Sequence, residues 1–296
     1  MDSRHHALAA LLVAAPLLLA CPGRDAAGAQ PAPVWLTRAQ GRSLVAPVDV
    51  AVDRRGIAFL LDAGNRSIVL LSVRGEVIRE IQGKGALRDP MAVAVAPDGA
   101  VFVADGNSGR AVEIDLAGRV RHEYAIGKGA RVTGVAVFGN AVFCADNANA
   151  TVAVFKRGGG RTGGWGGKGD LPGRFNAPFR VAVDPGGRIF VTDVMNARVQ
   201  WFSAFGQHLG TLRKFGAGEG KIFRPTGIFI DRMGRIWVTD SYSGLVQLFA
   251  EDGTFVRALG PAGRPVVFGD PVGVAEGPEG VWVADQRDQR AGFFPK

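Results

Sequence analysis

The chain has 296 residues, of which 47% are hydrophobic and 21% are charged, and its formal net charge at pH 7 is +8. This apolar content is enough for a buried core, which excludes an intrinsically disordered chain. The 43 glycines are spread along the chain and predict many turns, and the positive charge favours anionic partners such as acidic proteins, anionic glycans, phosphorylated lipid head groups or nucleic acid.

The first segment has the layout of an export signal. An apolar run from Ala7 to Ala20 follows MDSRHH and is too short to cross a bilayer. Its end, LLAC, resembles the lipobox of bacterial lipoproteins, in which the chain is cut before a cysteine that is then acylated. We therefore expect a signal peptide over residues 1–20, lipidation of Cys21 and a tether over residues 21–33. The protein would be a periplasmic or cell-surface lipoprotein that meets the membrane through this anchor only; a plain cleaved signal is the alternative.

From residue 47 onward the sequence repeats with a period of 40 to 47 residues, which is typical of propellers and solenoids. Each copy holds two short apolar runs joined by a turn of the PDG or PGG type, and a third and a fourth run follow. Each copy therefore predicts four short antiparallel strands, and no stretch after residue 33 has helical periodicity. The copies begin at residues 47–68, 90–111, 132–152, 178–199, 225–246 and 271–291.

These copies resemble NHL repeats. The pattern of that family, P-x-GVAVD, a DG turn, IFVTD, a loop with Asn, RVQ-x-F and a GxGxGxF connector, is followed closely by residues 165–249. The resemblance implies an all-β fold, a six-bladed β-propeller of four-stranded antiparallel blades, because NHL repeats form propeller blades. The sixth copy has room for three strands only. We therefore expect residues 34–46 to supply the outermost strand of the last blade, followed by the connector to the first copy, and so to close the ring, which gives a propeller domain over residues 34–296.

Basic residues gather in the connectors between the predicted blades. GKG recurs at residues 83–85, 127–129 and 167–169, so the glycine-rich stretch RTGGWGGKGD is interpreted as a connector rather than a phosphate-binding loop. The six connectors hold twelve Lys or Arg residues against four acidic ones. In NHL-type propellers the connectors lie on one face, so the resemblance implies a basic face with Trp165, Phe175 and Phe223 nearby. The residues expected to bind are Lys84, Arg88, Lys128, Arg131, Lys168, Arg174, Lys221 and Arg224.

Few residues offer catalytic or metal-binding chemistry. The repeats contain two histidines, His122 and His208, both in predicted outer strands, and Cys144 in AVFCAD is interpreted as a small buried hydrophobe. An aspartate ends the second strand of every copy; six such carboxylates could suggest Ca²⁺, but bonding to the backbone of the following loop explains a residue that every blade repeats. We assign no catalytic residue, no metal ligand and no cofactor. The six aspartates are Asp62, Asp105, Asp146, Asp193, Asp240 and Asp285.

The sequence favours a monomeric, non-enzymatic binding scaffold of the cell envelope, whose connector face holds a protein or an anionic envelope component. The simpler explanation of the cations is that they keep exposed loops soluble. The alternative function is a metal-dependent hydrolase or lyase acting in the central opening, because propellers similar to the NHL type include peptidyl-amide lyases, antibiotic lyases and lactonases, although no positions here match their ligand sets. Nucleic acid is not expected, since the chain is predicted to be exported and few aromatic residues lie among the basic ones.

Overall fold

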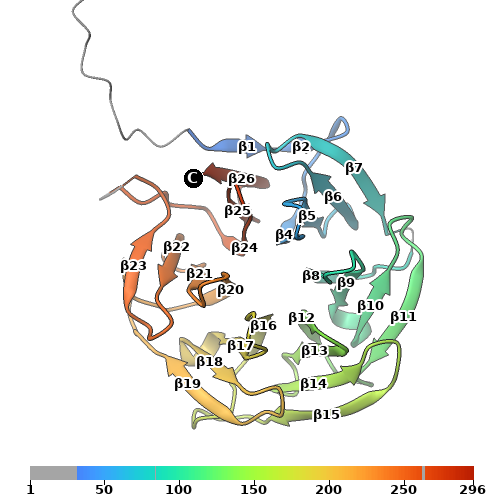
Figure 1. Cartoon of the computed structure of the whole chain (residues 1–296), viewed down its shortest axis with the longest axis vertical. Helices are drawn as coiled ribbons and strands as arrows, with labels where there is room; N and C mark the ends of the chain where they lie inside the picture. Colours follow the sequence, from blue (N-terminus) through green and yellow to red (C-terminus); the bar gives the residue numbers. More distant parts are fainter. Residues whose placement is uncertain (1–31, 84, 262–263) are drawn as a thin grey trace, which may run out of the picture. The chain divides into compact units, whose positions relative to one another are not determined.

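Six four-stranded antiparallel sheets surround a common axis, as Figure 1 shows. The computed structural model describes residues 32–83, 85–261 and 264–296. The predicted signal peptide and lipidation site lie outside these residues, and so does Lys84. The sheets belong to the unit Pro31–Lys296, and the first strand of each sheet packs against the first strand of the next around the axis. The predicted six-bladed, all-β propeller is confirmed.

Each blade runs from an inner strand at the axis to an outer strand at the rim. The first three blades are β4 (Pro47–Val52), β5 (Ala58–Asp62), β6 (Ser67–Leu71) and β7 (Val77–Gln82); β8 (Pro90–Val95), β9 (Val101–Asp105), β10 (Arg110–Ile114) and β11 (Val120–Ala125); and β12 (Val132–Phe138), β13 (Ala141–Asp146), β14 (Thr151–Lys156) and β15 (Arg161–Gly166). The fourth and fifth are β16 (Pro178–Val183), β17 (Ile189–Asp193), β18 (Arg198–Phe202) and β19 (His208–Leu212); and β20 (Pro225–Ile230), β21 (Ile236–Asp240), β22 (Leu245–Phe249) and β23 (Phe255–Ala258).

The last blade joins the two ends of the described chain. Its inner strands are β24 (Pro271–Glu276), β25 (Gly280–Asp285) and β26 (Arg290–Pro295), and its outermost strand is β1 (Val34–Leu36), antiparallel to β26. The predicted closure by an N-terminal strand is therefore confirmed. The rest of residues 34–46 forms the connector to the first blade, as expected, and holds a small hairpin of β2 (Arg38–Ala39) and β3 (Arg42–Ser43).

The core lies between neighbouring blades. Every residue of the second strands β5, β9, β17 and β21 is buried, since each of these strands is covered on both faces by adjacent sheets. Trp237 of β21 is fully buried, and its indole Nε1 donates to Glu276 Oε2 of the next blade at 2.9 Å. A single blade would leave these faces in water, so the free energy of burial is gained only when the blades stack.

The aspartate that ends each second strand is buried and binds backbone N–H groups. The main donors lie in the connector that precedes the blade, because the register places the start of the first strand opposite this aspartate. The expected bonds to the loop that follows also occur at Asp62, Asp146 and Asp240. The expectation was therefore incomplete, because it omitted the preceding connector. The connector donors are Val45 and Ala46 to Asp62, Arg88 and Asp89 to Asp105, Arg131 to Asp146, Asn176 to Asp193, Phe223 and Arg224 to Asp240, and Gly269 and Asp270 to Asp285.

Candidate functional site

The two faces of the propeller, at opposite ends of its axis, carry different kinds of loop. First strands begin, and second strands end, at one face, so the connectors between blades and the loops after the second strands lie together there. We call this face the connector face; its connectors are residues 37–46, 83–89, 126–131, 167–177, 213–224 and 259–270. The opposite face, the turn face, carries the tight turns, among them residues 53–57, 72–76, 115–119, 156–160, 184–188, 203–207 and 231–235.

Seven of the eight predicted binding cations are described, and all seven are exposed on the connector face: Arg88, Lys128, Arg131, Lys168, Arg174, Lys221 and Arg224. Within the described residues, none of these side chains forms an ion pair with a carboxylate. Arg174 also has a structural bond, because its Nη1 donates to Gly166 O at 2.8 Å. The remaining cations therefore present their charge to solvent.

Cations of the turn face are more often neutralised. Arg119 and Asp115, Arg188 and Asp184, and Arg235 and Asp231 form ion pairs across tight turns with N–O distances of 2.6–2.9 Å. At the first of these turns, hydrogen bonds from the backbone N–H and the side chain of Arg119 lower the pKa of Asp115 to about 2. The unpaired positive charge is consequently concentrated on the connector face.

Of the three aromatic residues expected beside the basic face, Phe223 alone is accessible there. Phe175 is completely buried against Phe202, and Trp165 is half-buried between Phe143 and Phe202. The expectation was wrong for Phe175 and Trp165, because their rings fill the gap between blades 3 and 4.

Sequence reasoning missed two exposed aromatic neighbours of Phe223. Phe215 is 65% exposed and Tyr242 is 62% exposed. Their ring centroids lie 5.5 and 4.4 Å from that of Phe223. Phe215 stands in the same glycine-rich connector, and Tyr242 follows the second-strand aspartate of the same blade; these two positions are the signal that could have identified them.

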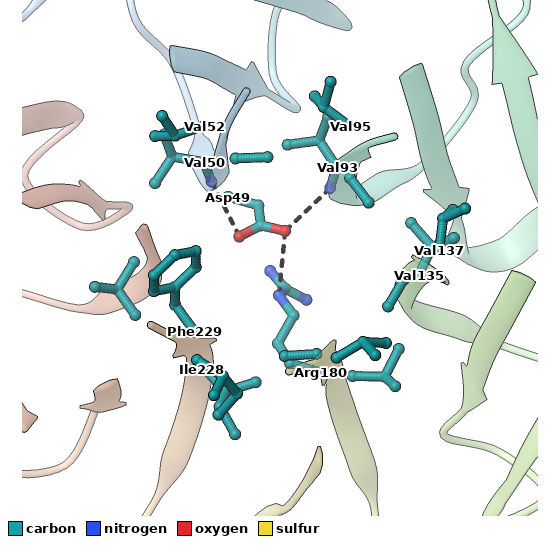
Figure 2. Close-up of a pocket in the computed structure, with 18 residues that line it drawn as sticks. Asp49, Val50, Val52, Val93, Val95, Val135, Val137, Arg180, Ile228 and Phe229 are labelled. Atoms are coloured by element: carbon teal, nitrogen blue, oxygen red, sulfur yellow. Dashed lines mark hydrogen bonds and ion pairs between the residues drawn. The ribbon is translucent and has the colours of Figure 1, made fainter. Parts of the chain in front are cut away.

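A small cavity of about 170 Å³ lies in the central channel. Its walls are apolar residues of the inner strands, as Figure 2 shows. The lining runs from Asp49 and Arg180 toward the turn-face ends of those strands. Among the residues that line it, these two are the charged ones. The cavity is therefore an apolar chamber with an ion pair at one end.

Arg180 crosses the channel and links several blades. Its Nη1 donates to Thr133 O at 2.6 Å and its Nη2 to Val48 O at 2.8 Å, while its Nε lies 3.6 Å from Asp49 Oδ2 (Figure 2). The Asp49 carboxylate also accepts from the backbone N–H of Val93 at 3.0 Å. Burial raises the pKa of Asp49 and lowers that of Arg180. The pair therefore joins blades 1 to 4 at a large desolvation cost.

The sequence contains a feature from which this pair could have been suspected. Asp49 and Arg180 occupy the third position of the first run, in PVD and PFR, where other copies place a small residue, as in PTG and PVG. The small residue is required at Gly227, since a Cβ there would lie 2.7 Å from Val272 O of the next inner strand. A charge at a position that otherwise holds glycine or alanine marks an unusual contact at the axis.

Within the described part of the chain, no group of three or more His, Cys, Asp or Glu side chains is placed to hold a metal ion. The two histidines lie on the outer strands β11 and β19, as expected, with His122 Nε2 3.1 Å from Gly159 O and His208 Nε2 2.9 Å from Thr211 Oγ1. The contact between His208 and the Thr211 hydroxyl lies within the outer strand β19, away from the central channel.

Cys144 is expected to be chemically inert in the folded protein. Its side chain is fully buried on β13, and burial, with a smaller contribution from Asp146, raises its pKa to about 12. In a Cys21→Ser variant, a thiol reagent at neutral pH should label Cys144 at least about a hundredfold more slowly than in the denatured chain, because reaction requires the thiolate and access. Rapid labelling of the native protein, followed by stopped-flow absorbance, would contradict this burial.

The ring of six four-stranded sheets, with connectors bound to strand-end aspartates, is a β-propeller. Residues 175–202 match the family model of the NHL repeat, and they lie in the fourth of the six copies that resemble this repeat. The chain is a six-bladed β-propeller that contains an NHL repeat over these residues. No curated protein matches its sequence. In the described residues there is no helix with the length and apolar content needed to cross a membrane.

Solved structures share this fold at low sequence identity. Virginiamycin B lyase from Staphylococcus aureus is 14% identical with a TM-score of 0.65, and the alignment covers 90% of this chain and 99% of that one. A gluconolactonase from Xanthomonas campestris is 12% identical with a TM-score of 0.66, covering 85% and 86% of the two chains. Hydrazine synthase from Kuenenia stuttgartiensis is 15% identical with a TM-score of 0.61, covering 88% and 99%. These similarities establish the fold, which hosts many functions.

Proposed function

We propose that this propeller is a non-enzymatic binding scaffold of the cell envelope, and that its connector face holds a protein or an anionic envelope component. The observation that carries the proposal is the contrast in ion pairing between the connector face and the turn face. Exposed cations such as Lys128, Lys168 and Lys221 are unpaired on the connector face within the described residues, whereas the turns of the opposite face neutralise many of theirs. A one-sided positive potential steers and orients an anionic partner.

Placement at the envelope is part of the proposal and depends on the sequence alone. The apolar run Ala7 to Ala20 would direct export, and acylation of Cys21 would anchor the propeller to a membrane. The charged groups in the channel are bonded mainly to the backbone of the ring, through Val93 N, Thr133 O and Val48 O. Among the described residues, Arg180 Nε has no hydrogen-bond partner and lies 3.6 Å from Asp49 Oδ2.

Reversing four connector-face charges is expected to reduce partner capture at least about tenfold. The variant is Lys128→Glu, Lys168→Glu, Lys221→Glu and Arg224→Glu, and all four side chains are exposed. The measurement is the amount of each component retained from envelope extract, as a function of salt concentration. Capture by the wild type should fall as salt rises, because surface charges are screened.

The matched control applies the same change of charge to the turn face, with Arg54→Glu, Arg74→Glu, Lys156→Glu and Arg232→Glu, all at exposed side chains. This control should capture as much as the wild type, and both variants should keep its melting temperature. Equal capture by all three proteins would overturn the proposal, because it would show that the position of the charges does not matter.

A second candidate is a metal-dependent hydrolase or lyase that acts in the central opening. It is favoured by the fold shared with virginiamycin B lyase and gluconolactonase, and by the carboxylate of Asp49 at the cavity. Elemental analysis of the purified protein tests it. A stoichiometric divalent metal, together with a lower melting temperature after chelation, would favour the enzyme over the scaffold.

A further inference from the structure

We infer that the partner of the connector face is a protein, and that an acidic segment of it inserts apolar side chains onto an aromatic platform formed by Phe215, Phe223 and Tyr242. This inference depends on the proposed function and names the chemistry of its partner. It begins with the three rings, which form one exposed cluster with centroid separations of 5.5 and 4.4 Å. Clustered aromatic residues with accessible faces are typical of the energetic centres of protein interfaces.

The platform is held rigidly before any partner arrives. The buried carboxylate of Asp240 accepts from the backbone N–H of Phe223 at 2.5 Å and from that of Tyr242 at 3.0 Å. The Gln247 side chain accepts from Gly220 N at 2.7 Å and donates to Lys221 O at 2.8 Å. Because the backbone on both sides of the rings is fixed, little conformational entropy is lost on binding.

The charges around the platform favour a partner of negative charge. Lys214, Lys221 and Arg224 belong to the same connector and are exposed, against Glu219 as the one acidic residue of that connector. Exposed cations in the connector that supplies two of the rings complement a segment that carries acidic residues beside one or two aromatic or aliphatic anchors.

Further exposed apolar residues lie on the connector face on both sides of the platform. On blade 4, Leu171 is 68% exposed and Met195 is 65% exposed, and in the connector to blade 6 Val267 is 66% exposed. Among described connector residues elsewhere, Val45 is a large hydrophobic side chain that is less exposed, at 47%. The most exposed apolar residues of the connector face therefore lie at blades 4 to 6, which suits an extended segment.

The kinds of residue in and around the platform favour a protein over a bilayer as the occupant. Phe223 and Tyr242 lie in contact and Arg224 follows in the same connector. Aromatic residues and arginine are enriched at the centres of protein interfaces.

The test uses random peptides displayed on phage and selected on the purified full-length protein. We expect selection of acidic peptides with aromatic or aliphatic residues, and we expect synthetic copies of them to bind at least about tenfold more weakly to Phe223→Ser and to Tyr242→Ser. Phe205→Ser is the matched control, because Phe205 is an aromatic residue of the turn face that is 98% exposed. Its peptide affinity should equal that of the wild type, and the melting temperatures should report that each variant is folded.

Two results would overturn the inference in distinguishable ways. If the affinity of the selected peptides falls in the connector-face charge reversal but not in Phe223→Ser or Tyr242→Ser, the platform is refuted and the scaffold proposal stands. If neither set of substitutions changes the affinity of the peptides, both the platform and the scaffold proposal are refuted. Vesicles of phosphatidylglycerol form a separate arm: binding of the wild type to them that is lost in Phe223→Ser, without selection of acidic peptides, would show that the platform meets a lipid surface instead.

Discussion

Replacement of Arg180 by methionine is expected to lower the melting temperature by about 10 °C, which corresponds to about 3–5 kcal/mol of folding free energy. The substitution removes donors to Thr133 O and Val48 O and leaves the Asp49 carboxylate buried without its cation. An uncompensated buried charge is costly because the surroundings replace little of the lost hydration. Differential scanning calorimetry measures the effect directly.

Asp49→Asn combined with Arg180→Met provides the control, because it removes both charges. We expect the double variant to recover most of the loss, so that the two substitutions are strongly non-additive. Destabilisation of the double variant equal to the sum of the two single variants would show that the ion pair is not the source of the effect.

The loss in Arg180→Met should also depend on pH. Without the cation, the pKa of Asp49 in the folded state, which burial already raises, rises further above its value of about 3.9 in the unfolded chain. An acid with a raised folded-state pKa contributes full stability below the unfolded value and loses it as pH rises through the folded value. The difference in melting temperature between variant and wild type should therefore be smaller near pH 4 than at pH 7.

Truncation of Trp35 to alanine is expected to cost about 3 kcal/mol and to loosen the closure of the ring. The indole of this β1 residue packs edge-on against Phe268 and Phe294 at centroid distances of 5.9 and 5.6 Å, and the guanidinium of Arg290 lies 3.9 Å from its ring centroid. Loss of a large aromatic side chain from such a contact leaves a cavity that the surroundings fill only in part. Hydrogen exchange should increase in β26 while that of β9, far from the closure, stays the same.

Trp35→Phe keeps an aromatic ring at this site and should remain within about 1.5 kcal/mol of the wild type. Deletion of residues 34–40 is the stronger change and should lower the melting temperature sharply, because it removes the outermost strand of the last blade. A melt that is unaffected by the deletion would contradict closure by β1.

The repeats made the fold predictable because each copy carries its own strand and turn chemistry. A proline or small residue, two apolar runs and a final aspartate recur six times. The strands of a copy with a weak pattern can therefore be assigned by alignment with the other copies. The exact length of the closing strand was less predictable, since β1 spans three residues and has one copy only. Pairing between β1 and β26 joins residues at opposite ends of the sequence, and local propensity contains no information about it.

The candidate site was predictable in its charges and less so in its aromatic residues. Lysines in GKG connectors have to be exposed, so their location followed from the repeat. Phe175 and Phe223 stand in equivalent connectors, yet the ring of Phe175 is buried and that of Phe223 is accessible. The two residues occupy different positions, because Phe175 lies three residues before Pro178 and the residue three before Pro225 is Ile222, which is also buried. Alignment of the connectors on these prolines would have separated them. The pairing of Asp49 with Arg180 could not be read from one repeat, since the two residues come from blades 1 and 4.

The way in which the ring closes also determines when folding of the protein can be completed. β1 is among the earliest strands to be synthesised, but its partner β26 is the last. Closure must wait until the whole propeller has been translated and, if exported, has crossed the membrane, since contacts of such long sequence separation form late and slowly. Until then β1 has no partner and the final sheet is absent, so a chain interrupted before β26 leaves open strand edges that proteases and chaperones can recognise.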